Sequence, residues 1–175
     1  LNKCITNKNQ LVTNASALVS TLAELNINTV FGYPGASVLS VYEELSKVSK
    51  IKHILVRHEQ AAVHMAEGYA KISDKPAVVL VTSGPGVTNT ITGIANAYAD
   101  STPLIVLAGD IARNNCKGKI FQKVDIINLT KTCCKKNYLL TAKDDIKQIL
   151  KEAYNIANSG KKGPVVITLP RNILE

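Results

Sequence analysis

The run Ala77-Val78-Val79-Leu80-Val81-Thr82-Ser83-Gly84-Pro85-Gly86 decides the fold of this chain. Its first six residues are mostly apolar and β-branched, which is typical of a strand that is buried on both faces of a parallel sheet. Its last four residues combine serine, glycine and proline, which is typical of a tight turn. The run therefore predicts a central strand that ends in a turn at the edge of a covered sheet.

The same alternation of strand and helix patterns extends to both sides of this run. Two further runs are as apolar, at residues 104–108 and 165–169, and shorter strands are predicted at residues 29–31, 51–56 and 138–140. Apolar residues recur at helical spacing between them, in residues 15–25, 36–47, 59–72, 87–99 and 146–156. Alternating strands and helices predict an α/β fold, with a doubly wound, mostly parallel sheet and helices on both faces.

Length and composition favour one globular domain that spans residues 1–175. The chain is 46% hydrophobic and 19% charged, which is typical of a globular and not of a disordered chain. No apolar run approaches the ~18–20 residues that are needed to span a bilayer. A formal charge of +8 could suggest nucleic-acid binding. The scattered lysines and the aromatic content of only 5% argue against it. The first residues lack the apolar region of a secretory signal. We therefore expect a cytoplasmic protein without membrane or nucleic-acid partners.

Neither the cysteines nor the histidines suggest a metal site. Cys4, Cys116, Cys133 and Cys134 form no C-x-x-C pair, and we expect reduced thiols, with Cys133 or Cys134 packed in a core. His58-Glu59 is followed by the next histidine, His64, six positions after the first rather than four. The two histidines therefore lie on different faces of the predicted helix, and we expect no zinc ligands there.

Three segments follow predicted strands and should meet at one edge of the sheet, where ligands of such folds bind. They are Gly32-Tyr33-Pro34-Gly35, Arg57-His58-Glu59 and Ser83-Gly84-Pro85-Gly86. Glu59 opens a helix, where a carboxylate can simply stabilise the helix start, or can exchange a proton with a ligand in a dry pocket. The glycine turn lacks the lysine of a phosphate-binding loop, and close packing of a flat ring against it is at least as plausible as anion binding.

Taken together and in order, the motifs resemble a known family. They are Phe31-Gly32-Tyr33-Pro34-Gly35, Arg57-His58-Glu59-Gln60, Thr82-Ser83-Gly84-Pro85-Gly86-Val87-Thr88-Asn89, Asp100-Ser101-Thr102-Pro103 and Phe121-Gln122. The chain resembles the N-terminal pyrimidine-binding (Pyr) domain of thiamine-diphosphate enzymes, most closely that of acetolactate synthases, from about Thr13 to Leu169. The resemblance implies the thiamine-diphosphate-binding fold.

The resemblance also implies a role for individual residues. Glu59 matches the catalytic glutamate of the family, which hydrogen-bonds N1′ of the cofactor's aminopyrimidine and moves a proton there. Pro85 and Asn89 match positions that line this ring. The remaining cofactor-binding positions implied by the resemblance are Tyr33, Pro34 and Gly35, in a loop near the cofactor and substrate, and Gln122, a glutamine that reaches the same site.

The chain departs from the acetolactate synthase pattern in two segments. Ala36 stands where these enzymes commonly have a second glycine, and Ser37 follows where alanine is frequent. The polar, lysine-rich residues 110–119 correspond to a segment that approaches flavin in the family. The central and diphosphate-binding domains of the family are not recognised in these residues, so we expect Mg²⁺ and FAD to bind only through such domains. The chain by itself is then expected to be inactive.

The resemblance implies an enzyme that decarboxylates pyruvate on thiamine diphosphate and condenses the product with a second 2-keto acid, a transferase reaction of branched-chain amino acid biosynthesis. It also implies a homodimer through the helices of the Pyr domain, with a regulatory subunit as a further candidate partner. Two alternatives remain. One is the Pyr domain or subunit of another thiamine-diphosphate 2-keto acid decarboxylase or oxidase, and the other is a non-catalytic dimerisation module.

Overall fold

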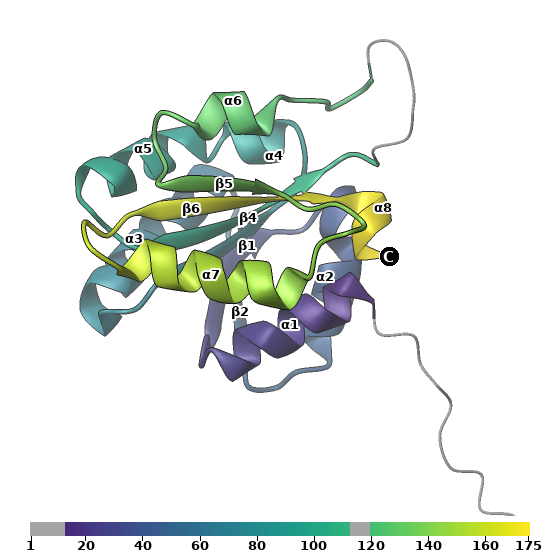
Figure 1. Cartoon of the computed structure of the whole chain (residues 1–175), viewed down its shortest axis with the longest axis horizontal. Helices are drawn as coiled ribbons and strands as arrows, with labels where there is room; N and C mark the ends of the chain where they lie inside the picture. Colours follow the sequence, from purple (N-terminus) through teal and green to yellow (C-terminus); the bar gives the residue numbers. More distant parts are fainter. Residues whose placement is uncertain (1–12, 113–119) are drawn as a thin grey trace, which may run out of the picture.

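The computed structural model describes residues 13–112 and 120–175, which form one sheet with helices on both faces (Figure 1). The strands are β1 (Thr29–Tyr33), β2 (Lys52–Leu55), β3 (Ala77–Val81), β4 (Leu104–Asp110), β5 (Lys136–Leu139) and β6 (Pro164–Pro170). All neighbouring strands are parallel, in the order β2-β1-β3-β4-β6-β5. The predicted doubly wound α/β fold is confirmed. Cys4, Cys116 and residues 113–119 lie outside the described part of the chain.

The position of each strand follows from its sequence. The central strands β3, β4 and β6 are buried along their whole length and consist almost entirely of apolar residues. The outer strands β2 and β5 each begin with an exposed lysine and are only partly buried. A lysine at a sheet edge disfavours pairing with a further strand, so the same residues that place these strands outermost also protect the edges.

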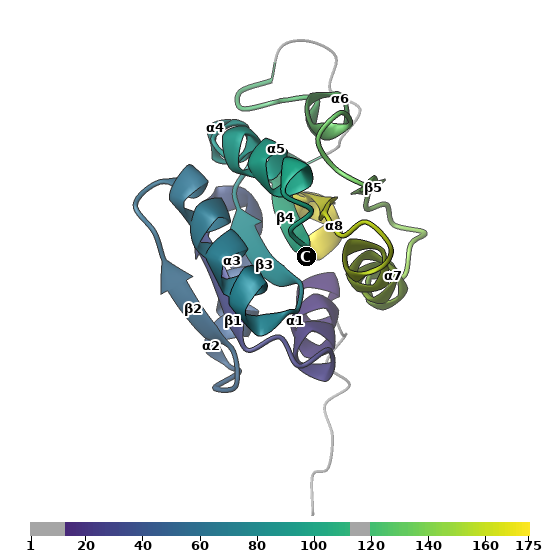
Figure 2. The ribbon, with the colours of Figure 1, turned by 90° about the vertical axis from the view of Figure 1, so that its left-hand side faces the viewer.

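Helices cover both faces of the sheet, as Figure 2 shows. On one face lie α1 (Asn14–Glu24), α2 (Leu39–Ser46) and α7 (Ile146–Asn158), with the short α8 (Arg171–Leu174) at the C-terminal end. On the other face lie α3 (Glu59–Ser73), α4 (Pro85–Thr88), α5 (Ile91–Ala99) and α6 (Ile126–Thr130). Each layer of helices encloses its own cluster of buried apolar side chains against the sheet.

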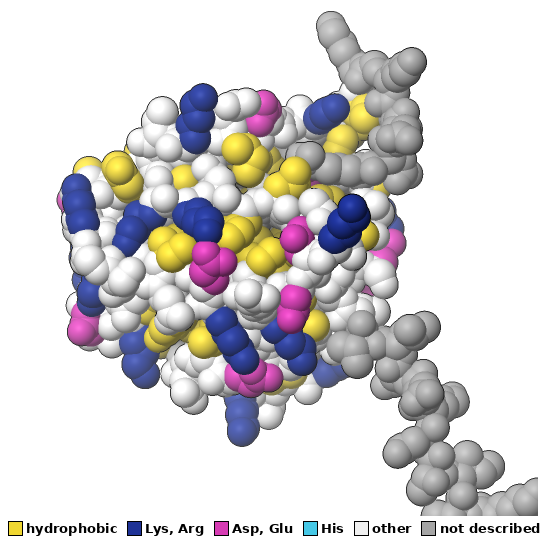
Figure 3. All heavy atoms as spheres, viewed as in Figure 1, with side chains coloured by type: hydrophobic (Ala, Val, Ile, Leu, Met, Phe, Trp, Pro, Cys, Tyr) yellow, Lys and Arg dark blue, Asp and Glu magenta, His cyan; other side chains and the backbone are white. Residues whose placement is uncertain are grey.

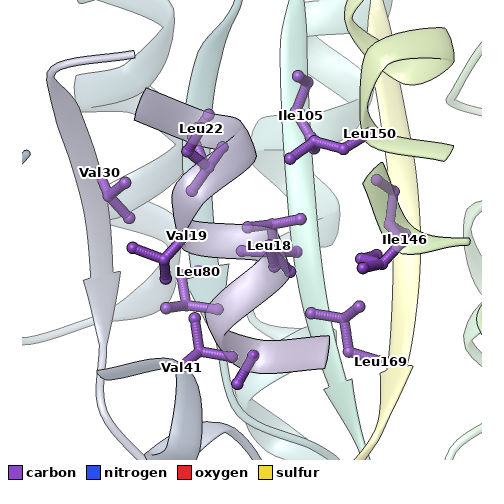
Figure 4. Close-up of a cluster of buried hydrophobic side chains, with 14 of the residues drawn as sticks. Leu18, Val19, Leu22, Val30, Val41, Leu80, Ile105, Ile146, Leu150 and Leu169 are labelled. Carbon is purple, nitrogen blue, oxygen red and sulfur yellow. The ribbon is translucent and has the colours of Figure 1, made fainter. Parts of the chain in front are cut away.

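The larger core shows why the helical pattern is amphipathic. Leu18 and Leu22 of α1 point at the sheet and are fully buried, and Ile146 and Leu150 of α7 converge on the same region (Figure 4). Residues three or four apart lie on the same side of a helix, so both leucines of α1, and likewise Ile146 and Leu150 of α7, are buried against the sheet together. Leu80 of β3 and Ile105 of β4 meet these side chains from the sheet.

Two helical predictions needed correction, and two short helices were not predicted. The helix predicted over residues 87–99 is divided into α4 and α5, and the one predicted over 36–47 begins with the 3₁₀ turn η1 (Ala36–Val38) before α2. The helices α6 and α8 were not predicted. At the division, Thr90 Oγ1 donates to the carbonyl of Val87 at 2.6 Å, and a side chain that bonds its own helix backbone tends to bend the helix there.

The surface carries its charges as mixed groups. On the face of Figure 3, lysine and arginine side chains lie among acidic ones and do not form one continuous basic patch. Several are paired, as in the ion pair between Lys136 and Glu152 at 2.6 Å. Among the described residues, no helix is both long and apolar enough to cross a membrane.

Candidate active site

The carboxyl ends of β1, β2 and β3 meet at one edge of the sheet, and the predicted site residues cluster at that edge. From β1 the chain moves outward to β2 and then returns to the other side of β1 as β3. The strand order thus reverses between β1 and β3, and a crevice at such a switch point is the usual ligand site of an open α/β sheet. The loops that follow these two strands form the walls of the site.

Glu59 is the first residue of α3, directly after the loop that follows β2. His58 caps this helix, because its Nδ1 accepts a hydrogen bond from the backbone N–H of Gln60 at 3.2 Å. The cap marks the start of the helix, and the side chain of Glu59 that follows it is buried, with only 9% of the residue exposed. A carboxyl group is therefore held under the protein surface at the ligand-binding edge.

The two carboxyl oxygens of Glu59 have different environments. Oε2 accepts a hydrogen bond from the Nδ2 of Asn89 at 3.0 Å. Oε1 accepts no hydrogen bond from any residue that the structure describes, and it lies beside Gly86. One oxygen is thus oriented by the protein, and the other remains available to a hydrogen-bond donor or acceptor of a ligand, depending on whether the carboxyl is ionised.

The turn after β3 brings the backbone close to Glu59. A Cβ atom at Gly86 would lie 2.8 Å from Cγ2 of Thr82 and 3.7 Å from Oε1 of Glu59, so a side chain there would crowd the carboxyl. Gly84 adopts φ 61° and ψ −119°, a conformation that residues with a Cβ avoid. These two glycines let the turn fold tightly against the glutamate.

The other predicted site residues lie around this corner. Gln122 has a φ of 60°, and its Oε1 accepts a hydrogen bond from Oγ of Ser83 at 3.5 Å. Pro85 is the exposed first residue of α4, and Tyr33 is the 40% exposed last residue of β1. Pro34 is exposed, and Gly35 packs so closely on Thr82 that a Cβ there would lie 2.4 Å from the threonine Cβ. The structure brings all of them to one edge and links Glu59 to Asn89 directly.

This arrangement fits an aminopyrimidine ring. Such a ring presents a nitrogen that can share a proton with a carboxyl, and it is flat, so it needs one free carboxyl oxygen and close backbone beside it. Oε1 of Glu59 and the backbone at Gly86 offer both. No residue of the described part need move to free that oxygen, because Asn89 already bonds to the other one.

Sequence reasoning missed a second buried carboxyl on the same helix. Glu67 is 4% exposed and accepts hydrogen bonds from Asn96 Nδ2 at 2.9 Å, while its other oxygen lies 2.8 Å from Nδ1 of His64. The bond to Asn96 repeats, two turns further along α3, the bond between Glu59 and Asn89. The spacing of eight residues between the glutamates and seven between the asparagines was the available signal.

Comparison of the sequence with known proteins finds a matching family. Residues 12–129 match the family model described as "Thiamine pyrophosphate enzyme, N-terminal TPP binding domain". That match includes every residue of the candidate site, from Tyr33 to Gln122.

Relatives of the chain carry one recurring description. The chain is 47% identical over 165 residues to the acetolactate synthase isozyme 3 large subunit of Escherichia coli, which covers 94% of this chain and 29% of that protein. It is 46% identical over 166 residues to the acetolactate synthase large subunit of Buchnera aphidicola from Acyrthosiphon pisum, covering 95% and 29%. It is 47% identical over 162 residues to the acetolactate synthase large subunit of Lactococcus lactis, and the match covers 92% of this chain and 28% of that protein. The chain thus spans less than a third of the length of these relatives.

Proposed function

The chain belongs to the thiamine pyrophosphate enzymes, as their N-terminal TPP-binding domain, and from this premise we propose that it holds the aminopyrimidine half of thiamine diphosphate in an acetolactate synthase. The single observation that carries the proposal is the buried Glu59 carboxyl, with Oε2 held by Asn89 and Oε1 open beside Gly86. When bound, thiamine diphosphate supplies the electron sink for decarboxylating one 2-keto acid and joining the product to another.

The proposed roles of the residues follow from their contacts. Glu59 holds or accepts a proton at Oε1, facing the ring nitrogen N1′. Asn89 keeps the carboxyl oriented through Oε2, and the burial of Glu59 excludes water that would compete for the same proton. Pro85 and Gly86 would line the ring from the turn after β3. Gln122 packs against Gly84 of the same turn and Gly35 against Thr82, which places Gln122 and the Tyr33–Gly35 loop beside it.

We propose pyruvate and a second 2-keto acid as substrates, in branched-chain amino acid biosynthesis. Similarity over most of this chain to acetolactate synthase large subunits supports this proposal. Mg²⁺ and FAD are assigned to other domains of such an enzyme, and Glu59, Asn89 and Gln122 to the pyrimidine site in this one. A regulatory subunit remains a further candidate partner.

A homodimer through the helices α3 and α5 is part of the proposal. Met65 and Ile72 project from α3 with 51% and 90% of their surface exposed, and Tyr98 of α5 is 38% exposed. Apolar side chains of this size gain free energy when a partner covers them. Sedimentation of the wild-type chain and of a Met65→Glu variant tests this, since a charge on that face should shift a dimer toward monomer.

Replacement of Glu59 tests the catalytic proposal. A chimera in which this chain replaces the matching residues of the Escherichia coli large subunit provides a complete enzyme. Glu59→Gln keeps the side-chain shape but removes the transferable proton, so hydrogen–deuterium exchange at C2 of bound thiamine diphosphate should slow by orders of magnitude. Circular dichroism should show an unchanged fold.

Two results would contradict the proposal. An unchanged C2 exchange rate in Glu59→Gln removes the role of the carboxyl. Calorimetric titration of a complex between the chain and a diphosphate-binding domain gives the second test. A dimer that forms with that domain but never takes up thiamine diphosphate would favour an assembly module instead.

A further inference from the structure

Ser37 joins the two loops that form the walls of the site. It lies in η1, after the loop that follows β1, and only 4% of the residue is exposed. Its Oγ is 3.0 Å from Oγ1 of Thr82 and accepts a hydrogen bond from the backbone N–H of Ser83, also at 3.0 Å. Thr82 and Ser83 follow β3, so one hydroxyl connects segments that are 45 and 46 residues apart.

The surrounding backbone is shaped to admit this hydroxyl. A Cβ atom at Gly109 of β4 would lie 2.3 Å from the Oγ of Ser37 and would exclude it. A Cβ at Gly35 would lie 2.4 Å from the Cβ of Thr82 and would push the two loops apart. The hydroxyl therefore occupies an enclosed position at the closest approach of the two loops.

The hydroxyl of Ser37 makes two hydrogen bonds to the segment that follows β3. A serine hydroxyl donates one hydrogen bond and can accept two. Ser37 accepts from the N–H of Ser83, and a second hydrogen bond joins its Oγ to Oγ1 of Thr82, in which either hydroxyl can be the donor. This second bond restrains the side chain of Thr82. Without the hydroxyl, the buried N–H of Ser83 would lose its partner.

The side chain of Thr82 packs against Gly86, and Gly86 lies beside the carboxyl of Glu59. Cγ2 of Thr82 lies 2.8 Å from the position of a Cβ at Gly86, and that same position is 3.7 Å from Oε1 of Glu59. A change in the rotamer of Thr82 would thus move the wall against which a ring must lie. Ser37 does not itself contact Glu59 in the described structure; it acts through Thr82 and the turn.

We propose that Ser37 is a positioning residue that sets the separation between the Tyr33–Gly35 loop and the Ser83–Gly86 turn, and with it the width of the slot for a flat heteroaromatic ring. The proposal rests on the proposed function, because it assigns the slot to an aminopyrimidine. Acetolactate synthases frequently have alanine at this position, so the hydroxyl of Ser37 is a departure of this chain from the family pattern and not a residue that the resemblance assigns to the site.

The test uses the ¹⁵N-labelled 175-residue chain and four variants. Ser37→Ala removes the hydroxyl, Thr82→Val removes its partner but keeps the methyl group, and Thr82→Ser keeps the partner hydroxyl as the conservative variant. Ser46→Ala is the matched control, since Ser46 is exposed at the end of α2 and its Oγ donates to the carbonyl of Glu43, away from the site. The probe is 4-amino-5-hydroxymethyl-2-methylpyrimidine, followed by the side-chain amide signal of Asn89.

In Ser37→Ala we expect the amide of Ser83 to exchange about tenfold faster or more, and the probe to bind about tenfold more weakly, since one buried hydrogen bond is lost. Amides of β4 should keep their exchange rates. Thr82→Val should weaken the probe in the same direction. Thr82→Ser keeps the hydroxyl but loses the methyl group beside Gly86, so its Ser83 amide should exchange within about twofold of the wild-type rate. Ser46→Ala should bind the probe within about twofold of the wild type. If Ser37→Ala opens globally, Thr82→Val decides alone.

The possible failures are distinguishable. If the wild-type chain binds the probe and both Ser37→Ala and Thr82→Val bind it equally well, the positioning role of Ser37 is overturned while the proposed function stands. If Ser83 exchanges no faster than in Ser46→Ala, the proposal is overturned as well. If the wild type shows no change at Asn89 at saturating probe, the proposed function fails, and the inference about Ser37 falls with it.

Discussion

At the scale of single residues, both the backbone conformation and the packing around Gly84 require a glycine. Its φ is positive, and a Cβ there would lie 2.8 Å from the Cβ of Gln122. Gly84→Ala should therefore lower the free energy of unfolding by about 1–3 kcal/mol, from backbone strain and from the displacement of Gln122. Urea unfolding followed by circular dichroism measures the change.

Gly68 provides the matched control for this substitution. It lies inside α3 with no positive φ, and a Cβ there would meet nothing within 4 Å. Gly68→Ala should therefore stabilise the chain by about 0.5–1 kcal/mol, because alanine restricts the unfolded chain and favours helix. Equal effects of the two substitutions would show that the special conformation of Gly84 has no energetic importance.

His53 gives the structure a dependence on pH. Burial lowers its pKa, and a hydrogen bond with the backbone of Gly32 opposes this only in part. Its Nε2 is buried with no hydrogen-bond partner in the part of the chain that is described, and its ring packs edge-on against Tyr42. A charge on this ring is therefore disfavoured in the folded chain.

The lowered pKa of His53 predicts lower stability in acid. As the pH falls below about 6.5, the unfolded chain binds a proton at His53 before the folded chain does, so the free energy of unfolding decreases until the folded pKa is passed. His53→Phe keeps an aromatic ring beside Tyr42 but cannot titrate. Urea unfolding at pH 7.5 and 5.5 should show a smaller acid loss for this variant; identical losses would exclude His53 as a cause.

Sequence reasoning reached the candidate site residues but not the contacts between them. The order of strand, glycine turn and helix placed Glu59 and Gly84-Pro85-Gly86 at the same edge, because parallel strands end together. The bond between Ser37 and Ser83 spans 46 residues, and no local pattern encodes it. Whether Glu59 meets Asn89 or solvent was likewise decided by how two helices pack.

At the scale of elements, a hydrogen bond from the exposed Asn96 to the buried Glu67 joins α5 to α3. Asn96→Ala removes the donor to Oε1 of Glu67, so a buried carboxylate oxygen loses its partner, and stability should fall by about 1–3 kcal/mol. Glu67→Gln should cost less than Glu67→Ala, because an amide oxygen can still accept from Asn96. Thermal unfolding measures all three.

Thr92 is the control within the same helix. It is exposed on α5, and its replacement by alanine should leave the melting temperature nearly unchanged or slightly raised, because alanine favours helix. If Asn96→Ala melts at the same temperature as Thr92→Ala, the link between α3 and α5 contributes nothing, and the position of Glu59 depends on the first turn of α3 alone.

The elements that sequence reasoning predicted best are those with the strongest periodicity. In α7, Ile146, Leu150 and Ala153 lie on one face and are buried, as the spacing predicted. The division between α4 and α5 was missed because residues 87–99 keep an otherwise helical apolar pattern across it; the structure has a side-chain bond from Thr90 to the Val87 carbonyl at that point. That division places Asn89 at the bend, where its side chain reaches Glu59.

At the scale of the whole molecule, the fold was predictable because burial on both faces requires continuous apolar runs. The three such runs became the central strands β3, β4 and β6. The short outer strand β5 was predicted only approximately, at residues 138–140 rather than Lys136–Leu139, because an edge strand needs fewer apolar residues. Strand order was not derivable from the runs alone, since it depends on which helices cross which face.

Cys133 and Cys134 can report on the opening of the whole molecule. Each is 8% exposed in the core between the sheet and α6. Burial raises the pKa of both thiols, and the neighbouring Cys133 adds to the effect on Cys134, whose pKa is raised to about 11. At pH 8 only about one Cys134 in a thousand is then a thiolate, against roughly one in four for an ordinary thiol.

Alkylation of these two cysteines should therefore follow global unfolding. In a chain with Cys4 and Cys116 replaced by serine, iodoacetamide at pH 8 should label Cys134 at least about a hundredfold more slowly in the native state than in urea, from its lower thiolate fraction and its burial together. A destabilising substitution such as Gly84→Ala should speed labelling in proportion to the unfolded population. Rapid labelling of the native chain, at a rate that Gly84→Ala leaves unchanged, would mean that this corner opens locally and that the two helix layers do not unfold as one unit.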